Sequence, residues 1–156
     1  EFRTFFEFNI PSGNVQIFKF VSPIDFILFE QSLSVDAGSI RFQAITGATE
    51  VATFNTALPI ISKNRMAQRK QPYYTPVITI STHAAPVSFG SGITGGTVVE
   101  NTRVVASNAT AQQQTVGGGA QSERGLGAGT YYLRLHNFGS GAATGVYSLF
   151  WEEKPV

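Results

Sequence analysis

The stretch YYLRLHNFGSGAATGVYSLFW, residues 131–151, decides the fold class. Two runs of large side chains flank a loop of Gly, Ser, Ala and Thr. Each run has the period of two that is typical of a β-strand, in which successive side chains point to opposite faces. Small residues between two such runs favour a short connection between antiparallel strands. The sequence therefore predicts a hairpin at this end of the chain.

Both faces of this predicted hairpin carry large side chains. One face of each run is apolar or aromatic, with Tyr131, Leu133, Leu135, Tyr147, Leu149 and Trp151. The opposite faces mix apolar and polar residues, namely Tyr132, Arg134, His136, Val146, Ser148 and Phe150. A strand that packs on one core needs a single apolar face, so something must cover the mixed faces.

Two explanations of the mixed faces remain open from the sequence. Loops of the same chain can cover them, or a partner subunit can, because large exposed apolar patches mark interfaces. In the second case the chain forms a dimer or trimer. Its interface then consists of Tyr132, Arg134, Val146 and Phe150.

Alternation with a period of two continues through the rest of the chain and predicts further strands. They cover residues 2–10, 15–21, 25–35, 39–46, 50–54, 73–80, 98–106 and 109–116. Turn residues recur every 8–12 positions or so, the spacing expected of β-sandwiches and barrels. No long amphipathic helix interrupts them, which argues against parallel sheets. We predict one all-β domain over residues 1–156, an antiparallel β-sandwich of jelly-roll type with about nine or ten strands.

The composition excludes several classes of function. Charged residues make up 13% of the 156 residues and the formal net charge is +1, whereas binding several phosphates of a nucleic acid needs a clear excess of Lys and Arg. The absence of cysteine excludes disulfides, thiolate metal ligands and cysteine nucleophiles. No apolar run is long enough for a membrane-spanning helix. We therefore expect neither a nucleic acid nor a membrane as partner.

No catalytic or metal-binding motif stands out. The histidines, His83 and His136, lack the sequence context of known catalytic motifs, and the acidic residues are scattered without the spacing of a calcium loop. The glycine-rich segment 117–129 lacks the Gly-Lys-Ser/Thr of a phosphate-binding loop. We expect no catalytic residue, cofactor or metal. An enzyme would require His83 or His136 to lie in a pocket with a serine and a carboxylate.

The segment LPIISKNRMAQRKQP, residues 58–72, is the most basic part of the chain and precedes two tyrosines. It is either a solvated loop or an arm that binds an acidic partner, since Arg pairs with carboxylates and Arg and Tyr often dominate the energy of interfaces. We favour the arm. Its predicted partner-binding residues are Lys63, Arg65, Arg69, Lys70, Tyr73 and Tyr74.

The pattern AGTYYLRLHNFGSGAATGVYSLFWEE, about a sixth of the chain, resembles the final two strands of certain jelly-roll modules. These include the accessory C-terminal domains of secreted bacterial peptidases. Such modules often carry acidic calcium ligands. Because Asp25 and Asp36 are the only aspartates here, the resemblance does not extend to calcium binding.

A second resemblance covers three segments: NRMAQRKQPYYTPVITI, VVENTRVVASNATAQQQTVGG and ERGLGAGTYYLRLHN. In their order and residue pattern these segments are similar to small proteins encoded among the virion structural genes of tailed bacteriophages. This resemblance implies a non-enzymatic capsid decoration or cement protein. It would lie on the virion surface, bind the major capsid protein or another lattice protein, and bridge capsomers.

The alternative hypothesis is a carbohydrate-binding or tail-associated receptor-recognition module with the same fold. Such a module needs an aromatic platform that is open to solvent. Tyr73, Tyr74 or Trp151 would supply it.

Overall fold

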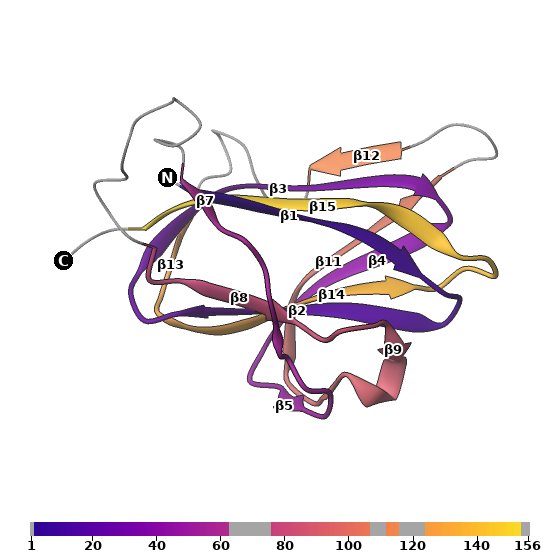
Figure 1. Ribbon diagram of the computed structural model, residues 1–156, viewed down its shortest axis with the longest axis horizontal. Coiled ribbons are helices and arrows are strands. Elements are labelled where there is room, and N and C mark those ends of the chain that lie inside the picture. The colour runs from indigo at the N-terminus through magenta and orange to yellow at the C-terminus, as the bar shows by residue number, and fades with distance from the viewer. Residues whose placement is uncertain (1, 63–75, 107–111, 116–123, 154–156) are drawn as a thin grey trace.

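A computed structural model describes residues 2–62, 76–106, 112–115 and 124–153 of the chain. Two β-sheets lie face to face and form the two layers of a sandwich (Figure 1). Within the described residues the only helical element is a short 3-10 turn, η1 (Phe89–Ser91). No helix among the described residues is long and apolar enough to span a membrane.

The first sheet has six strands, and β1, β3 and β15 are the long ones. Its order is β12-β3-β15-β1-β7, and β13 also pairs with β3. The strands are β1 (Phe2–Ile10), β3 (Phe26–Ala37), β7 (Ile61–Ser62), β12 (Gln112–Thr115), β13 (Arg124–Leu126) and β15 (Ala143–Glu153).

The second sheet has seven strands in the order β11-β4-β14-β2-β8-β6, and β9 also pairs with β2. The strands are β2 (Asn14–Ser22), β4 (Ser39–Thr46), β6 (Thr56–Ala57), β8 (Thr79–Thr82), β9 (Val87–Ser88), β11 (Thr97–Val105) and β14 (Gly129–Asn137). A separate two-stranded ribbon joins β5 (Thr49–Glu50) and β10 (Ile93–Thr94).

The order of the strands is that of a jelly roll. In chain order, the strands that build it are β1, β2, β3, β4, β11, β12 with β13, β14 and β15. The central strand of one sheet, β15, lies between β1 and β3, and that of the other, β14, lies between β2 and β4. This interleaving of early and late strands in two packed sheets confirms the predicted all-β, jelly-roll sandwich. The strands outnumber the nine or ten predicted because several have two to four residues, too few to show alternation.

The predicted terminal hairpin is wrong, because β14 and β15 belong to different sheets. β14 pairs with β2 and β4, whereas β15 pairs with β1 and β3. Residues 138–142 carry the chain across from one sheet to the other (Figure 1). A period of two shows which side chains share a face but not which strand lies alongside. A connection between strands of two different sheets therefore has the same sequence pattern as a hairpin.

Asn137 holds this corner together. Its side chain is fully buried. Its Nδ2 donates to the carbonyls of Ile10 at 2.8 Å and Gly141 at 2.7 Å, and its Oδ1 accepts from the Gly139 N–H at 3.0 Å. These bonds satisfy backbone groups that the corner takes out of the sheets.

Two other predicted strands differ from the structure. The strand expected at 50–54 shortens to Thr49–Glu50 of β5. The strand expected at 73–80 is β8, Thr79–Thr82, which begins later; residues 73–75 lie outside the described residues. Both regions belong to the long excursion between β4 and β11, where burial still alternates at 51–55 and 76–80 although pairing covers only part of each region.

Gly145 on β15 allows a close approach to β3. It lies at a bulge in the β15–β3 pairing, and a Cβ placed there would collide with the carbonyl oxygen of Ser34 and meet the ring of Phe8. Both neighbours belong to the packed sheet, so neither can move away without cost.

Replacing Gly145 by Ala should therefore lower the free energy of unfolding by about 1–3 kcal/mol, the usual cost of overpacking. Gly141→Ala is the matched control, because nothing lies within 4 Å of a Cβ there, and it should change stability by less than about 0.5 kcal/mol. Urea unfolding followed by tryptophan fluorescence measures both. Equal stability of the two variants would contradict the close approach.

Candidate functional site

The excursion between β4 and β11 covers part of the outer face of the seven-stranded sheet. We call residues 47–57 and 83–94 the cover. A second hydrophobic cluster, separate from the core between the sheets, joins it to β2, β4 and β14; its buried members are Val15, Ile17, Ile45, Ile93 and Tyr132. Ala48, Phe54 and Val87 of the cover pack against this cluster. Figure 1 shows β5 on the side of this sheet that faces away from the other sheet, and β9 extends the sheet beside β2.

The cover explains the mixed face of the β14 run. Tyr132 is 5% exposed and Arg134 is 8% exposed, both enclosed by their own chain. The expectation that these two residues form an exposed oligomer interface is therefore corrected. The physical reason is that Phe54 packs against Tyr132, with ring centroids 5.9 Å apart, and Phe89 against Arg134.

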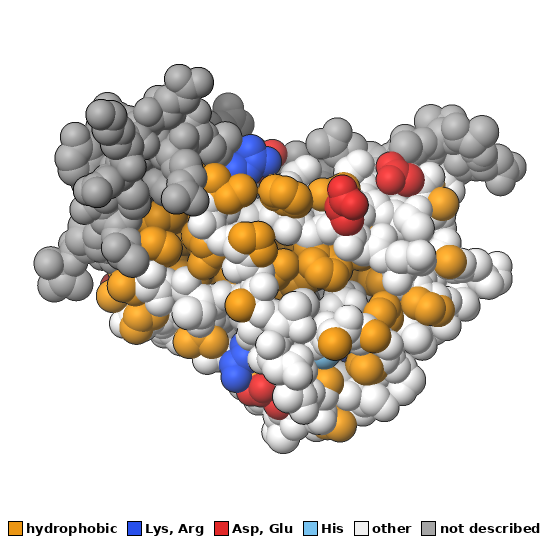
Figure 2. Space-filling view, in the orientation of Figure 1, with side chains coloured by type: hydrophobic (Ala, Val, Ile, Leu, Met, Phe, Trp, Pro, Cys, Tyr) orange, Lys and Arg blue, Asp and Glu red, His pale blue; other side chains and the backbone are white. Residues whose placement is uncertain are grey.

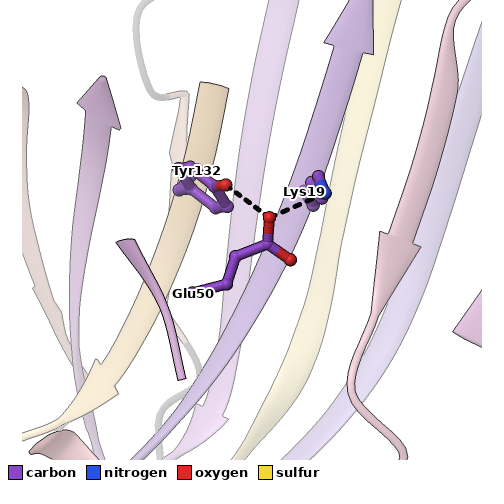
Figure 3. Close-up of polar contacts among 3 residues, drawn as sticks. All are labelled: Lys19, Glu50 and Tyr132. Atoms are coloured by element: carbon purple, nitrogen blue, oxygen red, sulfur yellow. Dashed lines mark hydrogen bonds and ion pairs between the residues drawn. The ribbon is translucent and has the colours of Figure 1, made fainter. Parts of the chain in front are cut away.

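A polar clasp closes the cover over β2 and β14 (Figure 3). Glu50 Oε2 accepts from Lys19 Nζ at 2.7 Å and from the Tyr132 hydroxyl at 2.9 Å. The bond from Lys19 lowers the pKa of Glu50. Burial, followed by the neighbouring Glu50 carboxylate, raises the pKa of Tyr132 to about 12. The clasp therefore keeps Glu50 charged and Tyr132 protonated at neutral pH.

Because the chain supplies its own cover, Tyr132→Ala should destabilise a single copy by about 3–5 kcal/mol, the usual cost of truncating a buried aromatic. The loss should be the same at all protein concentrations. Thermal unfolding over a hundredfold concentration range checks this. A loss of stability that grows on dilution would instead indicate that a partner subunit buries Tyr132.

His83 is a structural residue of the cover. It is 4% exposed. Its Nε2 accepts from the Ile17 N–H at 3.0 Å, and its Nδ1–H donates to the Ala85 carbonyl at 2.6 Å. These two bonds fix the neutral tautomer, and burial lowers the pKa of His83. Protonation of Nε2 would break the bond to Ile17.

The lowered pKa of His83 predicts a loss of stability in mild acid. The unfolded chain takes up a proton on His83 near pH 6.5, whereas the folded protein does so only at lower pH. Stability from this group is therefore complete above about pH 6.5 and falls as the pH decreases below it, by at most about 1.4 kcal/mol per pH unit. Urea unfolding from pH 7.5 to 5 measures the slope.

His83→Gln should flatten that slope. His136→Gln is the control for the other histidine, whose pKa is also lowered, first by burial and then by Arg134 and Arg41. If His83→Gln leaves the slope unchanged, His83 is not the group that titrates.

Neither histidine shows the arrangement required for nucleophilic catalysis. Both ring nitrogens of His83 bind backbone groups. His136 packs against Phe89 in a tilted arrangement, with ring centroids 4.7 Å apart, and its buried Nδ1 has no hydrogen-bond partner among the described residues. In the part of the chain that the structure describes, no three His, Asp or Glu side chains gather in a way that could hold a metal ion.

The remaining sequence-predicted residues divide into three groups. Lys63, Arg65, Arg69, Lys70, Tyr73 and Tyr74 lie outside the described residues. Val146 and Phe150 are half-buried on the outer face of β15. Trp151 is fully buried, donates from Nε1 to Glu153 at 3.2 Å and packs edge-on against Phe20. It cannot serve as an aromatic platform open to solvent.

The outer face of the six-stranded sheet carries apolar side chains that no described residue covers completely. Phe5 on β1 is 45% exposed. On the neighbouring β15, Val146 and Phe150 point to the same side, and Phe29 of β3 packs on Phe150 with ring centroids 5.5 Å apart. We call Phe5, Phe29, Val146 and Phe150 the apolar face. The sequence predicted its two β15 members from alternation but missed Phe5 and Phe29.

Charged residues border the apolar face. Arg3 and Glu30 lie on either side of Phe150 in the strand register, and Glu7 lies beside Val146. Charged side chains thus alternate with apolar ones across this face. Figure 2 shows that hydrophobic side chains also gather in a band along the edge of the sandwich, between the two sheets.

A cavity of about 220 Å³ opens between the sheets, near β13. Its lining is mainly apolar, with Phe20, Phe26, Leu28, Leu126, Leu133 and Leu149. Gln31 and Glu100 are among the polar residues that also border it, together with Thr46, and Gln31 Nε2 donates to Glu100 Oε2 at 3.4 Å. Such a lining suits an apolar group and provides no paired acid and base.

Comparisons of this chain with family models, with curated proteins and with solved structures find no match. The case for a function therefore depends on the residues and surfaces described above.

Proposed function

We propose that this chain is a structural protein of a virion, a decoration or cement protein that binds the outside of a phage head. The apolar face carries the proposal. Phe5 is 45% exposed on β1, and on the same outer face Phe29 packs on the half-buried Phe150. Contiguous patches of this kind mark interaction sites. The resemblance to virion proteins and the use of jelly rolls in viral capsids support the same assignment.

The two outer faces of the sandwich differ in a way that suits a one-sided clamp. The seven-stranded sheet is partly closed by its own cover, which buries Tyr132 at 5% exposure. The six-stranded sheet has no comparable cover among the described residues. The seven-stranded side also exposes apolar residues, with Val98 at 47% and Val105 at 54%, so the two faces differ in how far the chain covers them and not in being apolar or polar.

The binding energy of such a clamp would come from many weak contacts. Burial of one aromatic side chain contributes roughly 1.5–3 kcal/mol, so a single apolar face gives modest affinity after the entropy of association is subtracted. A shell presents the same partner many times, and an oligomer that touches neighbouring capsomers gains from multivalency. In this proposal the partner is the major capsid protein or another lattice protein, and copies of the chain assemble as dimers or trimers.

The basic segment at 63–74 has a complementary role in this proposal. Lys63, Arg65, Arg69 and Lys70 would pair with carboxylates on the lattice surface, and Tyr73 and Tyr74 would pack beside them. Bidentate pairs between Arg and carboxylate fix orientation as well as affinity. In this proposal the apolar face contributes the buried contact area, and the basic segment fixes the orientation of the protein on the lattice.

Co-sedimentation with emptied heads of tailed phages tests the proposal. Phe5→Ser should weaken binding about tenfold or more, because each buried ring is worth at least one factor of ten. Val51→Ser is the matched control, since Val51 is 55% exposed but lies on the cover. Arg65→Ala and Arg69→Ala should weaken binding in a salt-dependent way.

Two results would contradict the proposal. The first is equal weakening by Phe5→Ser and Val51→Ser. The second is a chain that sediments as a monomer and binds no head but binds sugars on a glycan array, which would favour the carbohydrate-binding alternative.

A further inference from the structure

Basic side chains form a row on the outer face of the seven-stranded sheet, beside the cover. Arg103 of β11 lies opposite Arg41 of β4, and Arg41 lies opposite His136 of β14. Arg134 precedes His136 by two positions on β14, points to the same face and lies opposite Gln43. The residues between them, such as Leu135 and Phe42, point into the core. We call Arg41, Arg103, Arg134 and His136 the arginine row.

Phe138 holds two of these guanidinium groups in place. The Cζ atoms of Arg41 and Arg103 lie 5.4 Å and 5.7 Å from the centre of its ring. Both distances are within the range of a cation–π interaction. The two side chains are therefore held against one ring, on neighbouring strands that lie about 4.7–4.9 Å apart.

Phe89 and Gln43 hold the other end of the row. The Arg134 guanidinium lies 4.4 Å from the centre of the Phe89 ring, and the same ring packs against His136 in a tilted arrangement. Arg134 also donates from Nε at 3.1 Å and from Nη2 at 2.6 Å to the Gln43 Oε1. An amide rather than a carboxylate accepts these bonds, so the positive charge is not neutralised.

No described carboxylate compensates the charge of the row. The ion pair among the described residues is the one between Lys19 and Glu50, and both of these residues belong to the clasp. Burial and then Arg41 lower the pKa of Arg134, as expected where like charges face each other without a counter-ion. Like charges directly opposite on adjacent strands destabilise a sheet.

Two buried nitrogen atoms of the row also lack partners. Arg41 Nε and His136 Nδ1 have no hydrogen-bond acceptor or donor among the described residues. Both side chains are partly exposed, so it is these two atoms and not the whole side chains that are closed off from water. Buried polar atoms without partners are uncommon, and here they show that the polar groups of the row are not fully satisfied by the described residues.

We infer that the arginine row is a binding site for a small oxyanion, a carboxylate or a phosphate group. The oxyanion lies between Arg41 and Arg103, whose guanidinium N–H groups are not used by any described carboxylate. Planar guanidinium groups match the oxygen spacing of both ligands and bind them through paired hydrogen bonds. The positive charge of Arg134 and the polar ring of His136 add to the electrostatic attraction of the bound anion. The inference is independent of the apolar face and of the proposed virion function.

Thermal unfolding at pH 7 tests the site with sodium phosphate and sodium acetate, each against sodium chloride at equal ionic strength. The anion that fits should raise the Tm by about 2–5 °C at a concentration several times its Kd. Phosphate as the more effective salt indicates a phosphoryl ligand, and acetate indicates a carboxylate. Arg103→Gln should abolish the difference from chloride, and because Arg103 is exposed this variant should fold normally.

Two controls separate the site from general salt effects. Arg3→Gln removes an arginine from the outer face of the opposite sheet, and Arg65→Gln with Arg69→Gln removes the basic arm; each should retain the full shift. Nuclear magnetic resonance of the arginine Nε–H groups should show Arg41 and Arg103 moving on titration with the effective salt. If Arg103→Gln and Arg41→Gln keep the wild-type shift in Tm, or if these two resonances stay fixed, the inference is overturned.

Discussion

The stacked contact of Tyr147 with Phe18 and Phe42 is the interaction on which the two-layer structure depends. The ring of Tyr147, on the six-stranded sheet, lies 5.4 Å from Phe18 and 5.6 Å from Phe42, both on the seven-stranded sheet. Offset stacking of this kind adds about 0.5–1.5 kcal/mol per pair to the burial of the rings. The Tyr147 hydroxyl donates to Gln31 at 2.7 Å, so the polar end of the side chain is also satisfied. These contacts set the distance at which the two sheets meet.

The character of the two outer faces depends on the large side chains that the core does not bury. The inner positions of β14 and β15 are used by the core, so large side chains at the alternate positions must be buried elsewhere. For β14 the excursion between β4 and β11 supplies that burial, with Glu50 bonded to both Tyr132 and Lys19. For β15 the alternate positions stay half-buried beside Phe5. The large side chains on the outer face of β14 are thus buried within the chain, whereas those of β15 stay half-buried among the described residues.

The sequence was sufficient for the elements with long alternation. β1 at 2–10 and β4 at 39–46 match their predicted ranges, and the jelly-roll sandwich follows from the number and spacing of such runs. The partners of the strands could not be predicted, because alternation is the same in a hairpin and in a corner between sheets. The cover could not be predicted from the sequence for a related reason. Tyr132 and Glu50 are separated by 82 positions, and no local pattern in β5 or β10 marks them as a lid for β14.

The candidate sites show the same division. Alternation placed Val146 and Phe150 on one face correctly, since that requires only the period of two. The companions of Phe150, and the alignment of Arg41 with Arg103 and His136, depend on the register between strands distant in the sequence. Tyr132 and Arg134 have the same alternation as Val146 and Phe150, and only the fold of the excursion distinguishes an enclosed pair from an open one.

The position of β14 and β15 in the middle of their sheets has a consequence for synthesis. During translation β1 and β3 emerge first, but their shared neighbour β15 is more than a hundred residues behind β3. Until it arrives, each sheet is split into two halves with unpaired edges, which invite wrong pairing. Contacts between such distant segments also make folding slow. Neither sheet can therefore complete its central pairing until the last two strands have emerged.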